Sequence, residues 1–278
     1  MAGTSPGMTE REWSSQRKLL MDSVTPTSHV AAPPAVPAPP PRVWKFWGTA
    51  LWGIFIFAAM FVGQATVIAY FVWQQGTFDI AEAIRVVGGG LTISLSVMMG
   101  LPAVVLAAWI AIRPTRTAFA DYLALRWPSW RELLIGIAAL AVLVGCWDLL
   151  SRGLGREVTP GFMGDVLKSA QASGALWLLV IAFTIAAPVS EEIMARGFLY
   201  RGWSESRLGV TGAIFLSSLA WTSLHLQYDW FFFGEVFSIG LLLGYLRYRT
   251  NSTWLTIVVH GVNNLAATIQ TIWLTGQG

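Results

Sequence analysis

Two adjacent carboxylates follow a long apolar run. Glu191 and Glu192 follow the apolar stretch 175–189 after a single serine, and Arg196 lies four residues after Glu192. Residues four apart on a helix share a face, so Glu192 and Arg196 can pair. Glu191 is rotated by about 100° from that face, which leaves its charge free. One carboxylate held by a cation beside one free carboxylate is suited to general-base catalysis.

Further polar residues occur in two later apolar segments. His225 lies in the segment 210–227, and His260 begins the sequence HGVNN, which puts Asn264 one helical turn further on the same face. A rise of 1.5 Å per residue predicts that Glu191, His225 and His260 lie at overlapping depths in three spans. A single histidine in a span is often an interhelical hydrogen-bonding residue. The joint pattern indicates a polar active site, because each ionisable group in a bilayer costs about 3 kcal/mol on insertion scales.

The residue types allow two kinds of hydrolytic chemistry. Glu191 and His225 could activate a water for attack on an amide carbonyl, while His260 and Asn264 donate hydrogen bonds to the resulting oxyanion. Alternatively, Glu191, His225 and His260 could bind a divalent metal such as zinc, although the HExxH spacing of helical zinc proteases is absent. The cofactor is therefore either none or a divalent metal.

Three motifs make the segment similar to a known family. The sequence resembles the CAAX-processing and bacteriocin-processing intramembrane endopeptidases, also called the type II CAAX prenyl endopeptidase or Abi family. Its motif EExxxR matches Glu191 to Arg196, FxxxH appears as Trp221 to His225 with tryptophan in place of phenylalanine, and HxxxN matches His260 to Asn264. The motif-bearing core covers about residues 123–272.

The resemblance implies a glutamate-dependent intramembrane protease with supporting residues around its site. In that reading Glu191 and His225 activate water, and His260 and Asn264 stabilise the oxyanion. Glu192 and Arg196 support them, and Trp221 supplies an aromatic wall. The expected partners are a membrane-associated protein or peptide, prenylated or otherwise lipid-anchored, and the lipid bilayer. Some members of the family act as scaffolds or in bacteriocin self-immunity, so a non-catalytic membrane adaptor remains the alternative.

The composition predicts an all-α bundle of transmembrane helices. Of the 278 residues, 55% are apolar and 12% are charged, about half the charged share of a soluble domain. No basic cluster suggests nucleic-acid binding. A transporter is disfavoured because the sequence has no symmetric halves. Seven apolar segments have lengths suited to spanning helices, at 46–73, 91–112, 133–150, 175–200, 210–227, 234–246 and 254–274.

The ends of the chain and its loops predict its orientation. Residues 1–45 contain the proline-rich run AAPPAVPAPPP and are expected to form a disordered tail, followed by a transmembrane domain at 46–278. Lysine and arginine concentrate in this tail and in alternate loops, Arg247 among them, which predicts a cytoplasmic N-terminus in the cytoplasmic (inner) membrane. Asp148 and Glu235 are expected at the membrane interface, and Gln270 between helices.

Overall fold

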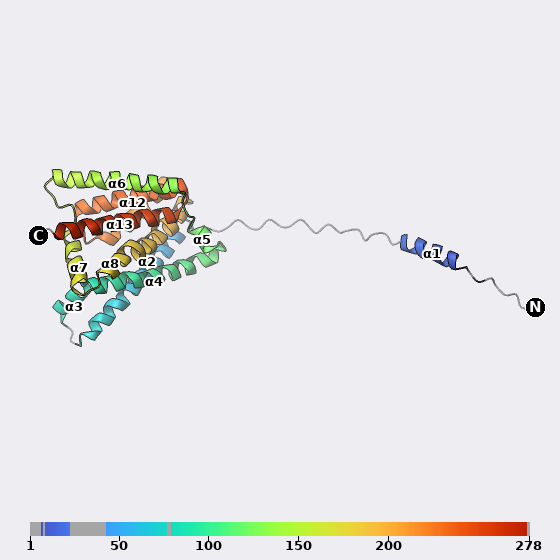
Figure 1. Cartoon of the computed structure of the whole chain (residues 1–278), viewed down its shortest axis with the longest axis horizontal. Helices are drawn as coiled ribbons and strands as arrows, with labels where there is room; N and C mark the ends of the chain where they lie inside the picture. Colours follow the sequence, from blue (N-terminus) through green and yellow to red (C-terminus); the bar gives the residue numbers. More distant parts are fainter. Residues whose placement is uncertain (1–6, 8, 23–42, 77–78, 277–278) are drawn as a thin grey trace, which may run out of the picture. The chain divides into compact units, whose positions relative to one another are not determined.

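The described part of the chain is helical throughout. The computed structural model describes residues 7, 9–22, 43–76 and 79–276, and contains no strand among them (Figure 1). This confirms the all-α fold class. The chain separates into two units, Met1–Pro40 and Pro41–Gly278. Each unit is described by itself.

The first unit contains a helix where a disordered tail was expected. Helix α1 spans Glu10–Asp22. Its sequence is rich in good helix formers, namely Glu, Arg, Gln, Lys and Leu. The carboxylate of Glu12 also accepts the backbone N–H of Thr9 at 2.9 Å, which satisfies a donor at the start of the helix. Residues 10–22 of the expected tail thus form a helix in this structure, whereas the proline-rich run 31–41 lies outside the described residues.

The second unit is a bundle of long helices joined by short helical segments. Its α-helices are α2 (Phe46–Gln74), α3 (Ile80–Val87), α4 (Gly90–Ile112), α5 (Phe119–Tyr122), α6 (Trp130–Gly153), α7 (Gly161–Ala172), α8 (Leu176–Ile181), α9 (Ala187–Glu192), α10 (Tyr200–Ser204), α11 (Gly209–Thr222), α12 (Trp230–Thr250) and α13 (Thr253–Thr275). Short 3₁₀ turns occupy Arg113–Thr115 and Ser223–His225, and π-helical stretches occupy Ala182–Ala186 and Ile193–Leu199.

In the part of the chain that the structure describes, five helices are long and apolar enough to cross a membrane, so this is a multi-pass membrane protein. They are Phe46–Gln74, Gly90–Thr115, Trp130–Gly153, Leu176–Ser204 and Trp230–Thr250. Five of the seven predicted segments thus correspond to such helices, and the sixth segment, predicted at 234–246, is longer than expected.

The other two predicted segments do not meet that description. Helix α11 has 14 residues, about 21 Å at 1.5 Å per residue, which is shorter than the hydrocarbon core of about 30 Å. Helix α13 has 23 residues but carries His260, Asn263, Asn264 and Gln270 within it, besides several threonines. By length and composition, five of the seven predicted segments thus qualify as spans among the described residues.

The helices pack in two groups around the segment that carries the glutamates. In Figure 1, α6, α12 and α13 lie along one another, and the three helices contact each other. Helix α2 packs against α4, and buried side chains there include Ile56 and Val104, which join Phe198 in one apolar core. The lipid-facing side of α6 is exposed, with Val142 at 68% and Leu149 at 71%. Such exposure of apolar side chains is expected for a helix that faces lipid.

A proline reshapes the helix that precedes the glutamates. In the π-helical stretch Ala182–Ala186, the N–H of Ala187 donates to the carbonyl of Ala182, five residues back. The usual partner of the Phe183 carbonyl is thereby taken, and the next residue, Pro188, has no N–H to offer. The Phe183 carbonyl is consequently available to a side chain from another helix.

Candidate active site

A buried ion pair forms the centre of the site. Oε1 of Glu192 accepts a hydrogen bond from Nη1 of Arg196 at 2.7 Å and lies 3.0 Å from Nδ1 of His260. Nη2 of Arg196 donates to the carbonyl of Gly240, and its guanidinium lies over the ring of Trp221 at 4.6 Å. Glu192 and Arg196 are both fully buried. The predicted Glu192–Arg196 pair is therefore present, and each charge is compensated, as burial requires.

Glu191 is the more accessible of the two carboxylates. Its side chain is 17% exposed, whereas that of Glu192 is 0% exposed. Oε2 of Glu191 accepts a hydrogen bond from Nε1 of Trp221 at 2.6 Å. Glu191 makes no ion pair with an arginine among the described residues, so its charge remains available, as the helical spacing predicted.

His260 lies between the two carboxylates. Nδ1 faces Glu192, whose pairing with Arg196 keeps it a hydrogen-bond acceptor, so Nδ1 carries the proton and Nε2 the lone pair in the neutral ring. Nε2 lies 3.9 Å from Oε2 of Glu191. This distance is too long for a direct hydrogen bond, and one water can bond to both atoms.

His225 lies on the other side of Trp221. The Trp221 ring is 5.1 Å from the His260 ring and 5.3 Å from the His225 ring, centroid to centroid. His225 is close enough to Glu191 to interact with it electrostatically. Nδ1 of His225 is buried and has no hydrogen-bond partner in the described part of the chain. The structure therefore brings His225 to the same cluster, with one ring nitrogen unused.

The segment that carries His225 differs from its prediction. It was expected within one helix over 210–227, but helix α11 ends at Thr222 and a 3₁₀ turn, Ser223–His225, follows. Such turns are common at the ends of α-helices because they satisfy the last carbonyl groups. His225 thus follows the end of a short helix, so its depth in the bundle does not follow from the α-helical rise alone.

The third motif docks on the π-helical stretch. Nδ2 of Asn264 donates to the available carbonyl of Phe183 at 2.9 Å, and Oδ1 of Asn264 accepts from Nδ2 of Asn263 at 3.3 Å. A Cβ added to Gly261 would lie 2.7 Å from the carbonyl oxygen of Thr184, so only glycine permits this close approach. Asn264 therefore holds α13 against the glutamate-bearing segment, and one of its two amide hydrogens is used in doing so.

The described residues do not offer a metal site. No group of three His, Cys, Asp or Glu side chains among them is arranged to hold a metal ion. Of the proposed ligands Glu191, His225 and His260, the last already has Nδ1 engaged with Glu192. The expected ligand set is therefore not assembled in this arrangement, and the chemistry below is derived from the side chains alone.

Two contacts of the site were not predicted. Trp221 was expected to be an aromatic wall, but its indole N–H also donates to Glu191. Arg247 was taken for a cation of a cytoplasmic loop, yet it is 2% exposed and donates to the carbonyl of Arg196 at 3.1 Å and to Oδ1 of Asn251 at 2.7 Å. Tryptophan stands at position 221 where the second motif of the family has phenylalanine, and its N–H could have indicated the contact with Glu191. Nothing in the local sequence distinguishes Arg247 from an exposed loop cation.

Fold and site together define a class of protein: a multi-pass helical membrane protein that encloses a compact cluster of two glutamates and two histidines. Comparison with known proteins agrees with the motifs. Residues 173–266 match the family model described as Type II CAAX prenyl endopeptidase Rce1-like, and this range contains all three motifs. The match confirms the family resemblance and covers less of the chain than the expected core at 123–272.

One curated relative is also similar over part of its length. The UPF0177 protein YbdI of Lactococcus lactis subsp. lactis (strain IL1403) is 32% identical over 114 residues, which are 41% of this chain and 56% of that protein. The chain thus aligns with little more than half of that relative. No solved structure matches the chain.

Proposed function

We propose that this protein is an intramembrane endopeptidase that hydrolyses a peptide bond with a water activated at Glu191. The observation that carries the proposal is the pair of atoms Oε2 of Glu191 and Nε2 of His260, which face each other 3.9 Å apart. Glu192, the neighbouring carboxylate, is neutralised by Arg196 and orients the imidazole. The family match at residues 173–266 agrees with a CAAX-type intramembrane protease.

The reaction follows from the positions of these groups. A water between Glu191 and His260 gives a proton to the Glu191 carboxylate while its oxygen attacks the amide carbonyl carbon. The carbonyl π-bond opens and leaves a negative charge on the oxygen. When the C–N bond breaks, the carbonyl re-forms and the proton held by Glu191 passes to the departing nitrogen. The products are a carboxylic acid and an amine, and the enzyme is regenerated.

The two histidines exchange roles relative to the assignment that the resemblance implies. His260 is the histidine whose lone-pair nitrogen faces Glu191, which favours it as the partner that polarises the water. His225, with a buried and unengaged Nδ1, is the better candidate to donate a hydrogen bond to the oxyanion. Asn264 retains one amide hydrogen for the same purpose.

The location of the site suggests the class of substrate. Glu191 and His260 lie within a bundle of membrane-spanning length, so a polypeptide reaching them must itself associate with the membrane. We propose a prenylated or otherwise lipid-anchored protein or peptide. The distribution of lysine and arginine supports the cytoplasmic (inner) membrane with a cytoplasmic N-terminus.

The test compares membrane peptides between cells that express wild-type protein and the variants Glu191→Gln and His260→Gln. Mass spectrometry of the membrane fraction should reveal fragments that require the wild-type protein and that fall at least 100-fold in both variants. Glu157→Gln serves as the control, because Glu157 is an exposed carboxylate in the segment between α6 and α7. The amount and the melting temperature of each variant should equal those of the wild type.

The same experiment separates an enzyme from a non-catalytic adaptor. An adaptor that uses the polar cluster to hold a partner produces no fragment that depends on Glu191. Unchanged fragments in a folded Glu191→Gln variant would refute the proposal. Because that variant keeps the shape of the side chain, co-purification of a partner is expected to survive the change in either case.

A further inference from the structure

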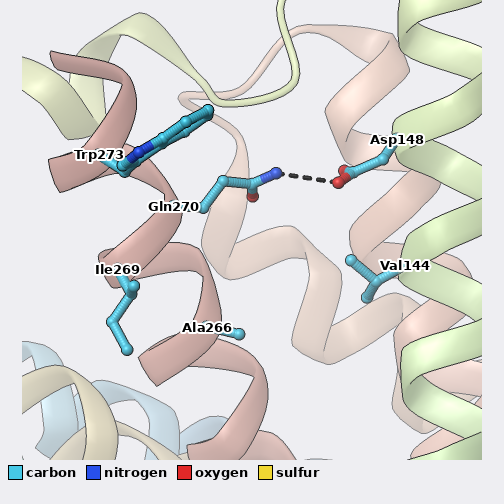
Figure 2. A pocket seen from close by; sticks show the side chains of 6 residues that line it. All are labelled: Val144, Asp148, Ala266, Ile269, Gln270 and Trp273. Atoms are coloured by element: carbon cyan, nitrogen blue, oxygen red, sulfur yellow. Dashed lines mark hydrogen bonds between the residues drawn. The ribbon is translucent and has the colours of Figure 1, made fainter. Parts of the chain in front are cut away.

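A second polar location lies between α6 and α13, away from the glutamate–histidine cluster. A cavity of about 510 Å³ is lined there by Val144, Asp148, Ala266, Ile269, Gln270 and Trp273 (Figure 2). Four of these residues are apolar. The amide of Gln270 reaches across the cavity and donates to Oδ2 of Asp148 at 2.9 Å. The cavity is open to the surroundings of the bundle, since Ile269 and Trp273 are both exposed.

The charge of Asp148 is uncompensated. Within the described ranges Asp148 has no ion-pair partner within 4.0 Å, and its hydrogen-bond partner is a neutral amide. Glu235 of α12 lies close enough to Asp148 to interact with it electrostatically and is a second carboxyl group beside the cavity. A carboxylate in a membrane span is costly without a cation, so this cavity is complementary to a cation.

The remaining acceptors specify the kind of cation. Oδ1 of Asp148 and Oε1 of Gln270 receive no hydrogen bond from another described side chain, and both are acceptors. A primary ammonium or a guanidinium can donate hydrogen bonds to these two oxygens. A quaternary ammonium has no N–H and cannot. The apolar side chains Val144, Ala266 and Ile269 fit the aliphatic stem of such a group.

The cavity lies further along α13 than the proposed active site, towards the C-terminal end of the helix. Asn263 precedes Gln270 by seven residues, two helical turns, and therefore lies on the same face. His260 precedes Gln270 by ten residues, about 15 Å along the helix axis. An extended polypeptide covers this distance with four or five residues.

We propose that the cavity between α6 and α13 is a subsite for a lysine or arginine side chain of a membrane-associated polypeptide, four or five residues from the bond that is cleaved. The position relative to the cleaved bond rests on the proposed function. The binding of a cationic side chain on an apolar chain does not, because it follows from the cavity and Asp148 alone.

Binding is tested with dodecylammonium, whose head and stem resemble a lysine side chain, on full-length protein in nanodiscs of phosphatidylcholine. The wild type should bind dodecylammonium at least tenfold more tightly than Asp148→Asn does, whereas neutral dodecanol should not distinguish the two proteins and dodecyltrimethylammonium, which has the charge without the hydrogen bonds, should distinguish them less. Asparagine keeps a hydrogen-bond partner for Gln270, so the variant should fold. Asp165→Asn, which removes an exposed carboxylate from α7, should bind like the wild type. Equal binding of dodecylammonium to wild type and Asp148→Asn would overturn the proposal.

The polypeptide is tested by the fragments that wild-type cells produce. Fragments that depend on Glu191 should carry lysine or arginine four or five residues from the new terminus, and Asp148→Asn should weaken this preference while cleavage continues. Tight binding of dodecylammonium together with fragments that lack the basic residue would assign the cavity to a lipid amine and refute the polypeptide. Absence of any Glu191-dependent fragment would refute the proposed function instead, and leave the binding result standing.

Discussion

The indole Nε1 of Trp221 in α11 donates a 2.6 Å hydrogen bond to Oε2 of Glu191 in α9, thirty residues earlier in the sequence. The bond fixes the carboxylate in the orientation in which it also faces His260. It uses one lone pair of Oε2 and leaves the remaining lone pairs of the carboxylate to accept a proton.

Replacement of Trp221 by phenylalanine removes this donor and keeps an aromatic ring under Arg196. We expect the rate of formation of Glu191-dependent fragments to fall about tenfold, because the loss of one hydrogen bond of about 1.4 kcal/mol corresponds to that factor. The measurement is the initial rate by mass spectrometry. An unchanged rate, with the melting temperature preserved, would show that the indole N–H has no part in orienting Glu191.

The buried pair of Glu192 and Arg196 predicts a stability effect. Arg196→Met leaves Glu192 buried without its cation, and should lower the free energy of unfolding by about 3–5 kcal/mol. The double variant Glu192→Leu/Arg196→Met should recover much of the loss, although it removes the group that orients His260. Thermal unfolding in detergent tests both; a double variant no more stable than Arg196→Met contradicts the account.

The close approach of α13 to the π-helical stretch predicts a steric effect at Gly261. Gly261→Ala puts a methyl group 2.7 Å from the Thr184 carbonyl and should destabilise the protein by about 1–3 kcal/mol. The matched control is Gly145→Ala in α6, because a Cβ there meets nothing within 4 Å. If both variants melt at the temperature of the wild type, the helices are not held at the observed distance.

Asp229 predicts a pH-dependent contribution to stability. The backbone N–H of Phe232, that of Phe231 and the guanidinium of Arg156 all favour the charged carboxylate and hold the pKa of Asp229 below its usual value. A carboxyl with a lowered pKa in the folded state stabilises the protein above the unfolded pKa of about 4, and this contribution is lost as the pH falls through the folded pKa. Asp229→Ala should therefore lower the melting temperature at pH 7 and have less effect at pH 3. A difference that does not narrow at low pH contradicts this origin.

The sequence predicted the members of the polar cluster better than their contacts. Helical spacing was sufficient for the Glu192–Arg196 pair and for the separate direction of Glu191, because both depend on local geometry. The contact of His260 with Glu192, 68 residues away, depends on packing between helices and has no local signal. Among the described residues five helices have the length and hydropathy of a span where seven segments were expected, because an apolar run does not reveal that α11 stops at Thr222, or how strongly polar side chains reduce the hydropathy of α13. Gln270 was correctly placed between helices.

The π-helical stretch next to Pro188 rotates the rest of the glutamate-bearing span relative to an uninterrupted α-helix. A π-helical turn contains one residue more than an α-helical turn. Each extra residue rotates the residues that follow it by about 100° around the helix axis. Glu191 and Glu192 therefore point where they do partly because of a turn completed before either glutamate, at Ala182–Ala186. Deleting one residue there would shorten the span by only about 1.5 Å, yet would swing both carboxylates out of alignment with α13.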